Sequence, residues 1–537
     1  MRRKLLYGLT LLLASASVVG LAACGDKETT TEADTTTNQN TTTNQDTTTN
    51  QDTTTQTPGP TVCKGTAEEL ANMKVDTVNL VPKKTVIKLY ADNGDAYANQ
   101  LAAQFQAAHP EYIVEVSKVG APDVRARMEL EGADGADVFV FPHDHVGPAL
   151  ASNLLAKAPN DVADGFKETL KASTLDTIRS CWDDATGKQK KCTETDEKYV
   201  FGAPLSAESN ALFYNRALVT QILLNEAGED GTTPFAEEVW NSIPEETKTK
   251  WENVAADLNG SNLSALMTLD DMLEVAKYYN SVESGNSRYF YQADFDDFYH
   301  SYMYLTPFGY DLFGEGGDDK TLDNLNSEPV LKALAYVQDK FGINSAKPWY
   351  PGADAIVQDT YMEEFYSGKA PIVVTGPWNA SNMYKNFAVG EGDNITYPNL
   401  GGCGMPDVVI DGVRKPSTTF SGVLVIGVSK LSKVTGDAWK LAQFMVSEEG
   451  ASILYSTSGK LPCLKDVNGI EGIQDDIVLN AVSAQLTNSK GMPSISEMGY
   501  MWTIGTTLFV DTFTNIAPAE AAKKAHDSYV AQAGIGA

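Results

Sequence analysis

The apolar residues after Pro82 are spaced alternately like those of strands and like those of helices. Residues 85–91 (TVIKLYA) and 112–119 (YIVEVSKV) are rich in β-branched and aromatic side chains, which predicts two strands. Residues 99–109 between them carry apolar residues at helical spacing, and residues 136–141 (ADVFVF) predict a third strand. This repeated strand–helix–strand order predicts an α/β fold with a mainly parallel sheet and helices on both faces.

The second half of the chain continues the same pattern. Residues 199–215 predict two strands around a bend, and residues 371–378 (PIVVTGPW) predict a buried strand that ends in a Gly-Pro turn. Residues from 354 onward predict an amphipathic helix that ends at Gly368, and residues 436–455 predict a helix with a break near Gly450. Because open α/β sheets bind ligands at the carboxyl ends of their strands, the residues that follow these strands are the first candidates for a site.

The N-terminal residues form a secretory signal followed by a low-complexity segment. Basic residues followed by an apolar run predict a signal peptide over 1–23. The sequence Leu-Ala-Ala-Cys24 at its end resembles the lipobox at which bacterial lipoproteins are lipidated. An ordinary signal peptide with a chance cysteine is the alternative. The TTTNQ repeats over 24–60 have almost no apolar side chains and predict a disordered tether, with a short extension over 61–82 before the body.

Length and charge limit the possible functions. The chain has 537 residues, with 41 Lys plus Arg against 71 Asp plus Glu and a formal net charge of −30. Without the signal and the tether roughly 470 residues remain, which is too many for one hydrophobic core and predicts two lobes. The negative charge disfavours binding to nucleic acid or to an anionic membrane surface, and it suits a protein exposed outside the cell.

Enzyme and metal signatures are missing from the sequence. It contains no GxGxxG, Walker, HExxH or GxSxG motif, and the five histidines do not favour a histidine-dependent enzyme. No CxxC or Cys/His cluster appears, so we expect no catalytic residue, no cofactor and no metal site. Cys181 and Cys192 bracket a short polar loop and could form a disulfide, and Cys63 is the candidate for an unpaired cysteine. The alternative is that all cysteines after Cys24 are free thiols.

Acidic and aromatic side chains follow several of the predicted strands or lie in aromatic-rich loops. Sugars need both kinds of group, because carboxylates accept hydrogen bonds from hydroxyls and aromatic faces cover the apolar face of a pyranose. Each position also has an ordinary alternative as a turn former, a helix cap or a core residue, and His143 is expected to be structural. The candidates are Tyr90, Asp92, Phe141, Asp144, His145, Glu208, Asp296, Asp297, Phe298, Trp378 and Trp502.

Five blocks of sequence resemble one protein family in order and spacing. They are VIKLYADNGDAY, ADVFVFPHDHVGPALASNLLAKAPND, APLSAESNALFYNRAL, TGPWNASN and PSISEMGYMW. From about Thr85 to the C-terminus the chain resembles the family-1 extracellular solute-binding proteins, and among them those that bind maltose and maltodextrins. The resemblance implies a two-lobed periplasmic-binding-protein-like fold of type II, with a mainly parallel sheet flanked by helices in each lobe and a hinge between the lobes. The lobes would be 83–206 with 407–458, and 207–406 with 459–537.

The same resemblance implies roles for individual residues. On the first lobe, Asp92 and Asp144 match sugar-hydroxyl acceptors, Phe141 takes the place of an aromatic platform, and Asp123, with a looser local match, corresponds to an acid near the cleft. Glu208 matches the hinge-side acid, and Asp296 and Phe298 match an acid and a tyrosine of the second lobe. Trp378 and Trp502 match the two tryptophans that stack on the sugar rings. The chain departs from the family pattern at Tyr90, Asn93 and His145, where the family has asparagine, lysine and arginine. These departures leave the exact sugar open. Cys403 and Cys463 both match positions near the lobe crossings, which makes them a second candidate disulfide.

The resemblance, together with the lipobox-like sequence at Cys24, implies the lipid-anchored substrate-binding subunit of an ABC importer. It would capture a maltose- or maltodextrin-like oligosaccharide, close by a hinge motion and deliver the sugar to membrane permease subunits. It would work as a monomer on the outer face of the cell membrane and catalyse no reaction. A surface glycoside hydrolase also needs paired carboxylates and aromatics, and a binding protein for another oligosaccharide, a sugar-sensing ectodomain or an adhesin are further alternatives. The insertions at 181–192 and 227–262 have no assigned function.

Overall fold

The computed structural model describes residues 84–91, 94–183, 185–190, 195–281, 287–314, 316–342 and 360–535. The chain divides into two compact units, Met1–Lys64 and Gly65–Ala537, and all described residues belong to the second. The predicted signal peptide, tether and extension therefore lie outside the described residues, together with Cys24 and Cys63. Among the helices that are described, none has both the length and the apolar composition required to cross a membrane.

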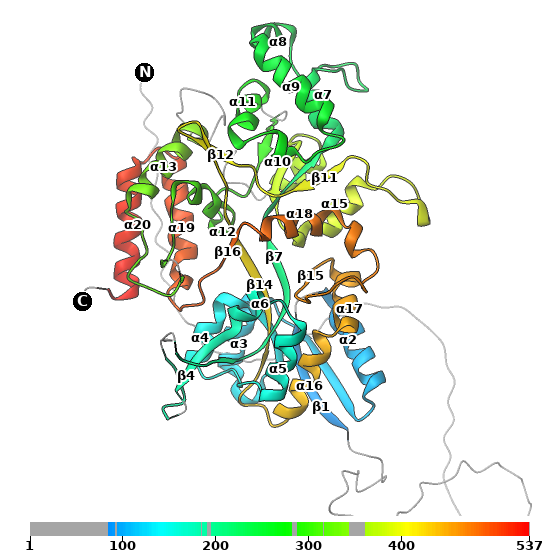
Figure 1. The fold of residues 1–537 in the computed structure, drawn as a ribbon, viewed down its shortest axis with the longest axis vertical. Coiled ribbons are helices and arrows are strands. Elements are labelled where there is room, and N and C mark those ends of the chain that lie inside the picture. The colour runs from blue at the N-terminus through cyan, green and yellow to red at the C-terminus, as the bar shows by residue number, and fades with distance from the viewer. Residues whose placement is uncertain are drawn as a thin grey trace, which may run out of the picture. The chain divides into compact units, whose positions relative to one another are not determined.

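The first sheet has seven strands in the order β15-β7-β14-β3-β1-β2, with β16 paired to β14. Figure 1 labels β15, β7, β14, β16 and β1 of this sheet. β1 pairs in parallel with β2 and β3, but β14 runs antiparallel to both β3 and β7. The expected mainly parallel sheet is therefore wrong, because β14 arrives from the far half of the chain and not through a strand–helix–strand crossover. The strands are β1 (Thr85–Ala91), β2 (Tyr112–Lys118), β3 (Val138–Pro142), β7 (Ala203–Ser209), β14 (Thr419–Val428), β15 (Leu461–Pro462) and β16 (Ser489–Gly491).

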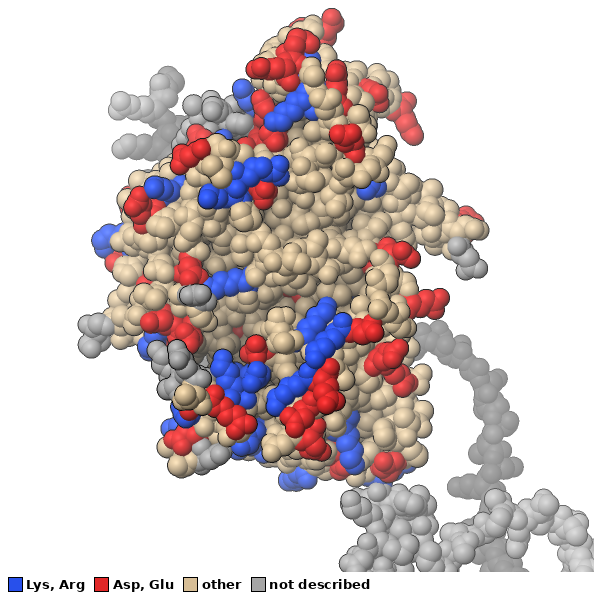
Figure 2. All heavy atoms as spheres, in the orientation of Figure 1, with Lys and Arg blue, Asp and Glu red and all other residues tan. Residues whose placement is uncertain are grey.

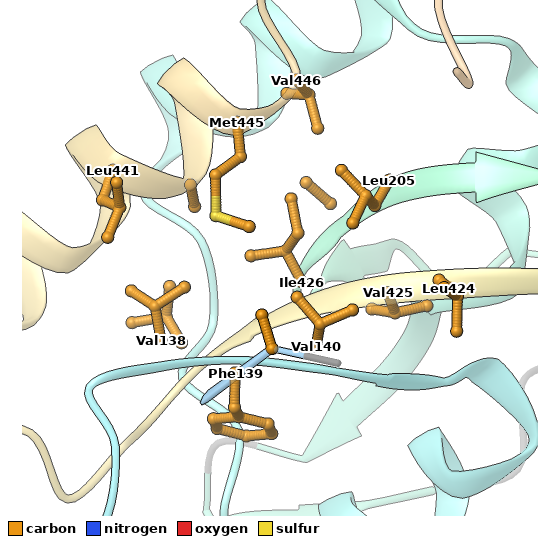
Figure 3. Packing of buried hydrophobic residues seen from close by; sticks show 14 of the residues in the cluster. Val138, Phe139, Val140, Leu205, Leu424, Val425, Ile426, Leu441, Met445 and Val446 are labelled. Carbon is orange, nitrogen blue, oxygen red and sulfur yellow. The ribbon is translucent and has the colours of Figure 1, made fainter. Parts of the chain in front are cut away.

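A first core packs around this sheet. Residues 138–141 on β3 are all fully buried, which explains why this strand reads as a continuous apolar run. Figure 3 shows Val138, Leu441 and Met445 together on one side of the sheet and the Phe139 ring on the other. The helices of this half are α2 (Gly94–Ala108), α3 (Val124–Glu131), α4 (Val146–Ala151), α5 (Asn160–Thr169), α6 (Ala172–Leu175), α16 (Thr435–Met445) and α17 (Glu448–Ser458).

The predicted break in the helical region 436–455 is confirmed, slightly ahead of the expected position. α16 ends at Met445 and α17 begins at Glu448. The Ser447 hydroxyl accepts a hydrogen bond from the backbone N–H of Gly450, which is the usual way a serine caps a helix N-terminus. Gly450 therefore lies in the first turn of the second helix and not in the break itself.

The second sheet has four strands in the order β11-β8-β10-β9. It is also mixed, since β8 runs antiparallel to β10 and β11 whereas β9 pairs in parallel with β10. Both of its faces are buried: Leu212 and Tyr214 of β8 pack into a second core, whereas Ala211 and Phe213 pack into a smaller third cluster. This split follows the period of two along a strand. The strands are β8 (Ala211–Asn215), β9 (Tyr291–Gln292), β10 (Ile372–Thr375) and β11 (Leu400–Cys403).

Helices contribute buried residues to the clusters on both faces of this second sheet. The helices of this half are α7 (Arg216–Leu224), α8 (Glu237–Ser242), α9 (Glu245–Asp257), α10 (Leu263–Leu266), α11 (Leu269–Tyr279), α12 (Phe298–Ser301), α13 (Glu328–Phe341), α14 (Tyr361–Tyr366), α15 (Ala380–Phe387), α18 (Ile477–Leu486), α19 (Met498–Phe513) and α20 (Pro518–Ala533). The insertion 227–262 contains α8 and α9, and Trp251 is buried there against Phe235. Figure 2 shows acidic side chains gathered on this end of the molecule, where Glu237, Glu238 and Glu245 begin the two helices.

The chain passes between the two sheets along neighbouring strands. The predicted bend within 199–215 is confirmed at the buried residue Asn210, between β7 and β8. β14 makes the return passage, because its Phe420 packs in the second core and its Val425 in the first. The hydroxyls of Ser209 and Thr419, 2.7 Å apart and buried, tie the two passages together. The lobe boundaries expected from the resemblance stay a prediction.

The cysteines outside the N-terminal segment are divided between different environments. Cys403 lies in the second core and Cys463 in the first, and both are buried free thiols, so the predicted disulfide between them is wrong. Burial raises the pKa of Cys463 to about 12. Cys181 is disulfide-bonded and lies on β4 (Arg179–Asp183), whereas Cys192 is outside the described residues, so their pairing stays a prediction.

Two small sheets complete the fold. One is formed by β4, β5 (Lys188–Gln189) and β6 (Lys198–Val200), and the other by β12 (Val408–Ile410) and β13 (Val413–Lys415).

Candidate functional site

Four aromatic side chains from distant segments form a continuous row, hereafter the aromatic row. The ring centroids are 6.0 Å apart between Trp378 and Tyr299, 6.1 Å between Tyr299 and Phe420, and 6.1 Å between Phe420 and Trp502. Phe420 is buried, Tyr299 and Trp502 are half-buried, and Trp378 is 41% exposed. The two ends of the row are therefore tryptophans that are partly exposed to solvent, and the buried Phe420 packs between Tyr299 and Trp502.

Asp144 joins the first half of the molecule to the end of this row. It lies in a short 3-10 turn, His143–His145, directly after β3. The indole N–H of Trp502 donates a hydrogen bond to Asp144 Oδ2 at 3.3 Å, a contact between residues 358 apart in the sequence. Asp144 Oδ1 is buried and has no hydrogen-bond partner among the described residues. Buried carboxylate oxygens normally accept hydrogen bonds, so this atom is available to a donor from a ligand.

His143 fixes the turn that carries Asp144. Its Nδ1 accepts a hydrogen bond from the backbone N–H of Val423 at 3.0 Å, so its Nε2–H is the atom that faces the Met492 carbonyl oxygen at 3.0 Å. Burial lowers the pKa of His143, with Asp144 opposing the shift, which favours this neutral form. The histidine is thus structural, as the sequence indicates, and it positions Asp144.

Glu208 lies at the end of β7, where the chain is about to pass to the second sheet. Its Oε2 is 3.3 Å from Nζ of Lys460, and its backbone carbonyl oxygen is 3.5 Å from the Tyr299 hydroxyl. Gly422 of β14 lies opposite, and a Cβ there would be 3.0 Å from Glu208 Cγ and 3.3 Å from the Tyr299 hydroxyl. A side chain at this position would displace its neighbours by a few tenths of an ångström, so glycine favours this close approach, which brings the carboxylate next to the aromatic row.

A group of acids and one histidine lies beside Trp378. The edge of the His300 ring meets the Trp378 ring at 5.8 Å, and the Asp297 carboxylate caps α12 by accepting the backbone N–H of Tyr299 at 2.6 Å. Burial raises the pKa of Asp294 to about 7, with Asp296 and Asp297 adding to the effect and His300 opposing it. Burial also acts to raise the pKa of Asp297, but the imidazole of His300 and backbone N–H groups outweigh it and lower this pKa.

Two aromatic residues predicted to belong to the sugar site are core residues. The Phe141 ring is fully buried and packs on Phe139 at 5.2 Å, because residues two apart on a strand share one face of the sheet. Phe298 is 1% exposed and packs edge-to-face against Trp502, with 6.3 Å between ring centroids. The expectation that either ring offers a free face to a sugar does not agree with this burial.

The less certain candidates have other partners or none. The Tyr90 hydroxyl donates to Glu131 Oε2 at 2.5 Å, with the Arg127 guanidinium 4.8 Å above its ring. Asp123 is exposed at the end of a 3-10 turn. His145 is half-buried beside Asp144, and burial lowers its pKa. Asp92 and Asn93 lie outside the described residues, so their expected roles stay predictions.

Sequence reasoning missed several residues that the structure places at the site. Tyr299 and His300 stand in the aromatic-rich segment that also holds the predicted Asp296 and Phe298, so their neighbourhood in the sequence could have indicated them. Phe420 is one apolar residue in a strand, and Lys460 is a single lysine after a helix, so neither carries a local signal.

Comparisons with known proteins agree with this architecture. A family model described as bacterial extracellular solute-binding protein matches residues 100–481. The chain belongs to this family of bacterial solute-binding proteins. It is 24% identical over 455 residues to the maltooligosaccharide ABC transporter solute-binding lipoprotein of Streptococcus pneumoniae, covering 80% of this chain and 88% of that one. It is 22% identical over 405 residues to the galactooligosaccharide-binding protein of Bacillus subtilis, covering 75% and 78%.

Solved structures of solute-binding proteins have the same fold. A cyclo/maltodextrin-binding protein complexed with maltotetraose superimposes with a TM-score of 0.61 at 22% identity, covering 84% of this chain and 98% of that one. The fold is therefore the type II periplasmic-binding-protein fold that the sequence resemblance implied.

Proposed function

We propose that this solute-binding protein is the capture subunit of an ABC importer and that its ligand is a maltose- or maltodextrin-like oligosaccharide. The observation that carries the proposal is the aromatic row with Trp378 and Trp502 at its ends, flanked by the carboxylates of Asp144 and Glu208. Aromatic faces cover the C–H face of a pyranose, and carboxylates accept its hydroxyls. The relatives named for maltooligosaccharides support the same ligand class.

The site draws its residues from both halves of the molecule, which supports capture by hinge closure. Asp144 follows a strand of the first sheet, whereas Trp502 packs against the second core, and the hydrogen bond between them joins the two. A ligand that contacts both sides favours the closed arrangement by the difference in its binding free energy between open and closed states. The passages at Asn210 and at the start of β14 are the places where the backbone would bend.

The capture subunit would be tethered outside the cell. Lipidation of Cys24 would anchor it to the outer face of the membrane, and the threonine-rich tether would let the monomeric body reach the permease subunits. The protein would transfer the sugar without changing it, so no catalytic residue is required.

Calorimetric titration of the purified protein with maltose, maltotriose and maltotetraose tests the proposal. We expect saturable binding of one sugar per chain and no loss of maltotriose from the solution over hours. Absence of binding to all three sugars would reject the ligand class, and release of glucose would favour a glycoside hydrolase. A galactooligosaccharide is the informative comparison sugar, because one relative is named for it; tighter binding of that sugar would replace the maltodextrin assignment.

A further inference from the structure

The acids beside Trp378 include a group with the composition of a metal site. Asp294, Asp297 and His300 each offer a donor atom, and these three atoms lie within 4.8 Å of one another. All three residues stand at intervals of three in the short segment between β9 and the end of α12. We propose that Asp294, Asp297 and His300 bind a divalent transition-metal cation, for which Zn²⁺ fits the donor set best. This inference does not depend on the identity of the sugar.

The state of His300 is the independent observation behind this proposal. The residue is 6% exposed, and neither ring nitrogen has a hydrogen-bond partner among the described residues. The nearest charged atom is Asp297 Oδ1, 3.7 Å from Nδ1, which is too long for a hydrogen bond. A buried imidazole without a partner is costly, and a cation bound to one of its nitrogens would remove that cost.

The surroundings hold the imidazole in one orientation. Its ring packs edge-on against Trp378 at 5.8 Å and against Tyr361 at 6.2 Å. Its backbone lies in the first turn of α12, which the Asp297 carboxylate caps. A ligand fixed before the ion arrives loses little conformational entropy on binding.

The two carboxylates complete the donor set and leave a route for the ion. Oδ1 of Asp297 accepts the Tyr299 N–H, which leaves Oδ2 for a cation, and the side chain is 47% exposed. Asp294 is half-buried close by, so a cation would also neutralise two neighbouring negative charges.

One nitrogen and two carboxylate oxygens match the preferences of Zn²⁺. Zinc takes four ligands from imidazole and carboxylate groups, and three protein ligands leave the fourth position to water or another oxygen. Calcium takes six to eight oxygen ligands, and this group does not provide them. The sequence predicts no metal site because it contains no Cys/His cluster. A site made of one histidine and two aspartates does not need such a cluster.

Titration of the EDTA-treated, dialysed full-length protein with ZnCl₂ in a calorimeter tests the inference, without sugar present. We expect one equivalent of Zn²⁺ to bind. His300→Ala and Asp294→Asn should each weaken it by at least about 100-fold, since loss of a group that only supports a ligand already costs about 10- to 100-fold. His526→Ala is the matched control, because His526 also stands next to an aspartate, with Nδ1 2.9 Å from Asp323 Oδ1. This variant should bind Zn²⁺ like the wild type.

Cobalt gives a second readout that depends on position. Bound Co²⁺ should quench the fluorescence of Trp378, so the quenching should be smaller in Trp378→Phe while the absorption spectrum of bound cobalt remains. Thermal melting of each variant checks the fold, and Asp297→Asn replaces His300→Ala if the latter melts early. No binding in the wild type, or equal binding in wild type, His300→Ala and Asp297→Asn, would overturn the site. Zn²⁺ binding without sugar binding would retain this site and reject the proposed sugar function, and the reverse result would do the opposite.

Discussion

Replacement of Trp378 by alanine distinguishes a ligand-stacking ring from a core ring. The side chain is 41% exposed and stands at one end of the aromatic row. If the ring stacks on a sugar, its removal should cost about 2–4 kcal/mol of binding free energy, as for aromatic hot spots in other interfaces. That loss corresponds to about a 30- to 1000-fold weaker affinity for maltotriose.

The structure also predicts how much stability the same change removes. The ring meets Tyr299 and His300 at 6.0 and 5.8 Å, both edge-on, and such contacts are worth about 0.5–1.5 kcal/mol each. Because the ring is partly in solvent, its truncation leaves an open hollow and not a closed cavity. We therefore expect the free energy of unfolding without ligand to fall by about 1–3 kcal/mol.

Trp439→Ala is the matched control for a core tryptophan. Trp439 is 2% exposed and packs in the first core, so its truncation should cost about 3–5 kcal/mol of stability. The fraction that remains folded should bind maltotriose like the wild type. Calorimetric titration with maltotriose and chemical unfolding without ligand measure both quantities for each variant. If Trp378→Ala loses as much stability as Trp439→Ala yet binds normally when folded, the stacking role of Trp378 is refuted.

Three further predictions concern the anchor, the disulfide and the glycine at the strand crossing. Cys24→Ala should appear in the medium or stay unprocessed, and partition of the wild-type protein into the aqueous phase of a detergent extraction would contradict the anchor. Peptide mapping of alkylated, non-reduced protein should recover Cys181 and Cys192 as one linked pair; separate alkylated peptides would exclude it. Gly422→Ala places a methyl group 3.0 Å from Glu208 Cγ, so we expect affinity for maltotriose to fall by at least about fivefold, or about 1 kcal/mol. Unchanged affinity in that titration would refute the expectation that the close approach of Gly422 to Glu208 determines sugar binding.

Part of the fold is determined locally and could be predicted from the sequence. The strands at 85–91 and 112–119 and the bend within 199–215 were predicted, because side-chain periodicity and turn residues act over a few neighbouring positions. The same pattern did not reveal that both sheets are mixed. Strand direction depends on where the chain re-enters a sheet, and the pattern of β14 is the same whether it pairs with its neighbours in parallel or antiparallel fashion.

In the candidate site, too, some features follow from neighbouring residues in the sequence and others depend on residues far apart in the chain. The sequence predicts that Asp144 follows a strand and that Trp378 follows a Gly-Pro turn. The structure places Trp378 in the aromatic row and Asp144 beside it. The burial of Phe141 was not predictable in this way, because position on a strand does not say whether the facing space is filled.

What the sequence determined by itself was therefore the kinds of element and the chemistry of the side chains at their ends. Only the tertiary structure decided which of these side chains meet. Lys460 pairs with Glu208 across 252 positions, and Trp502 donates to Asp144 across 358. Such contacts follow from the packing of two cores around strands that cross between them, and no short-range pattern encodes that packing because its free energy comes from residues distant in the chain.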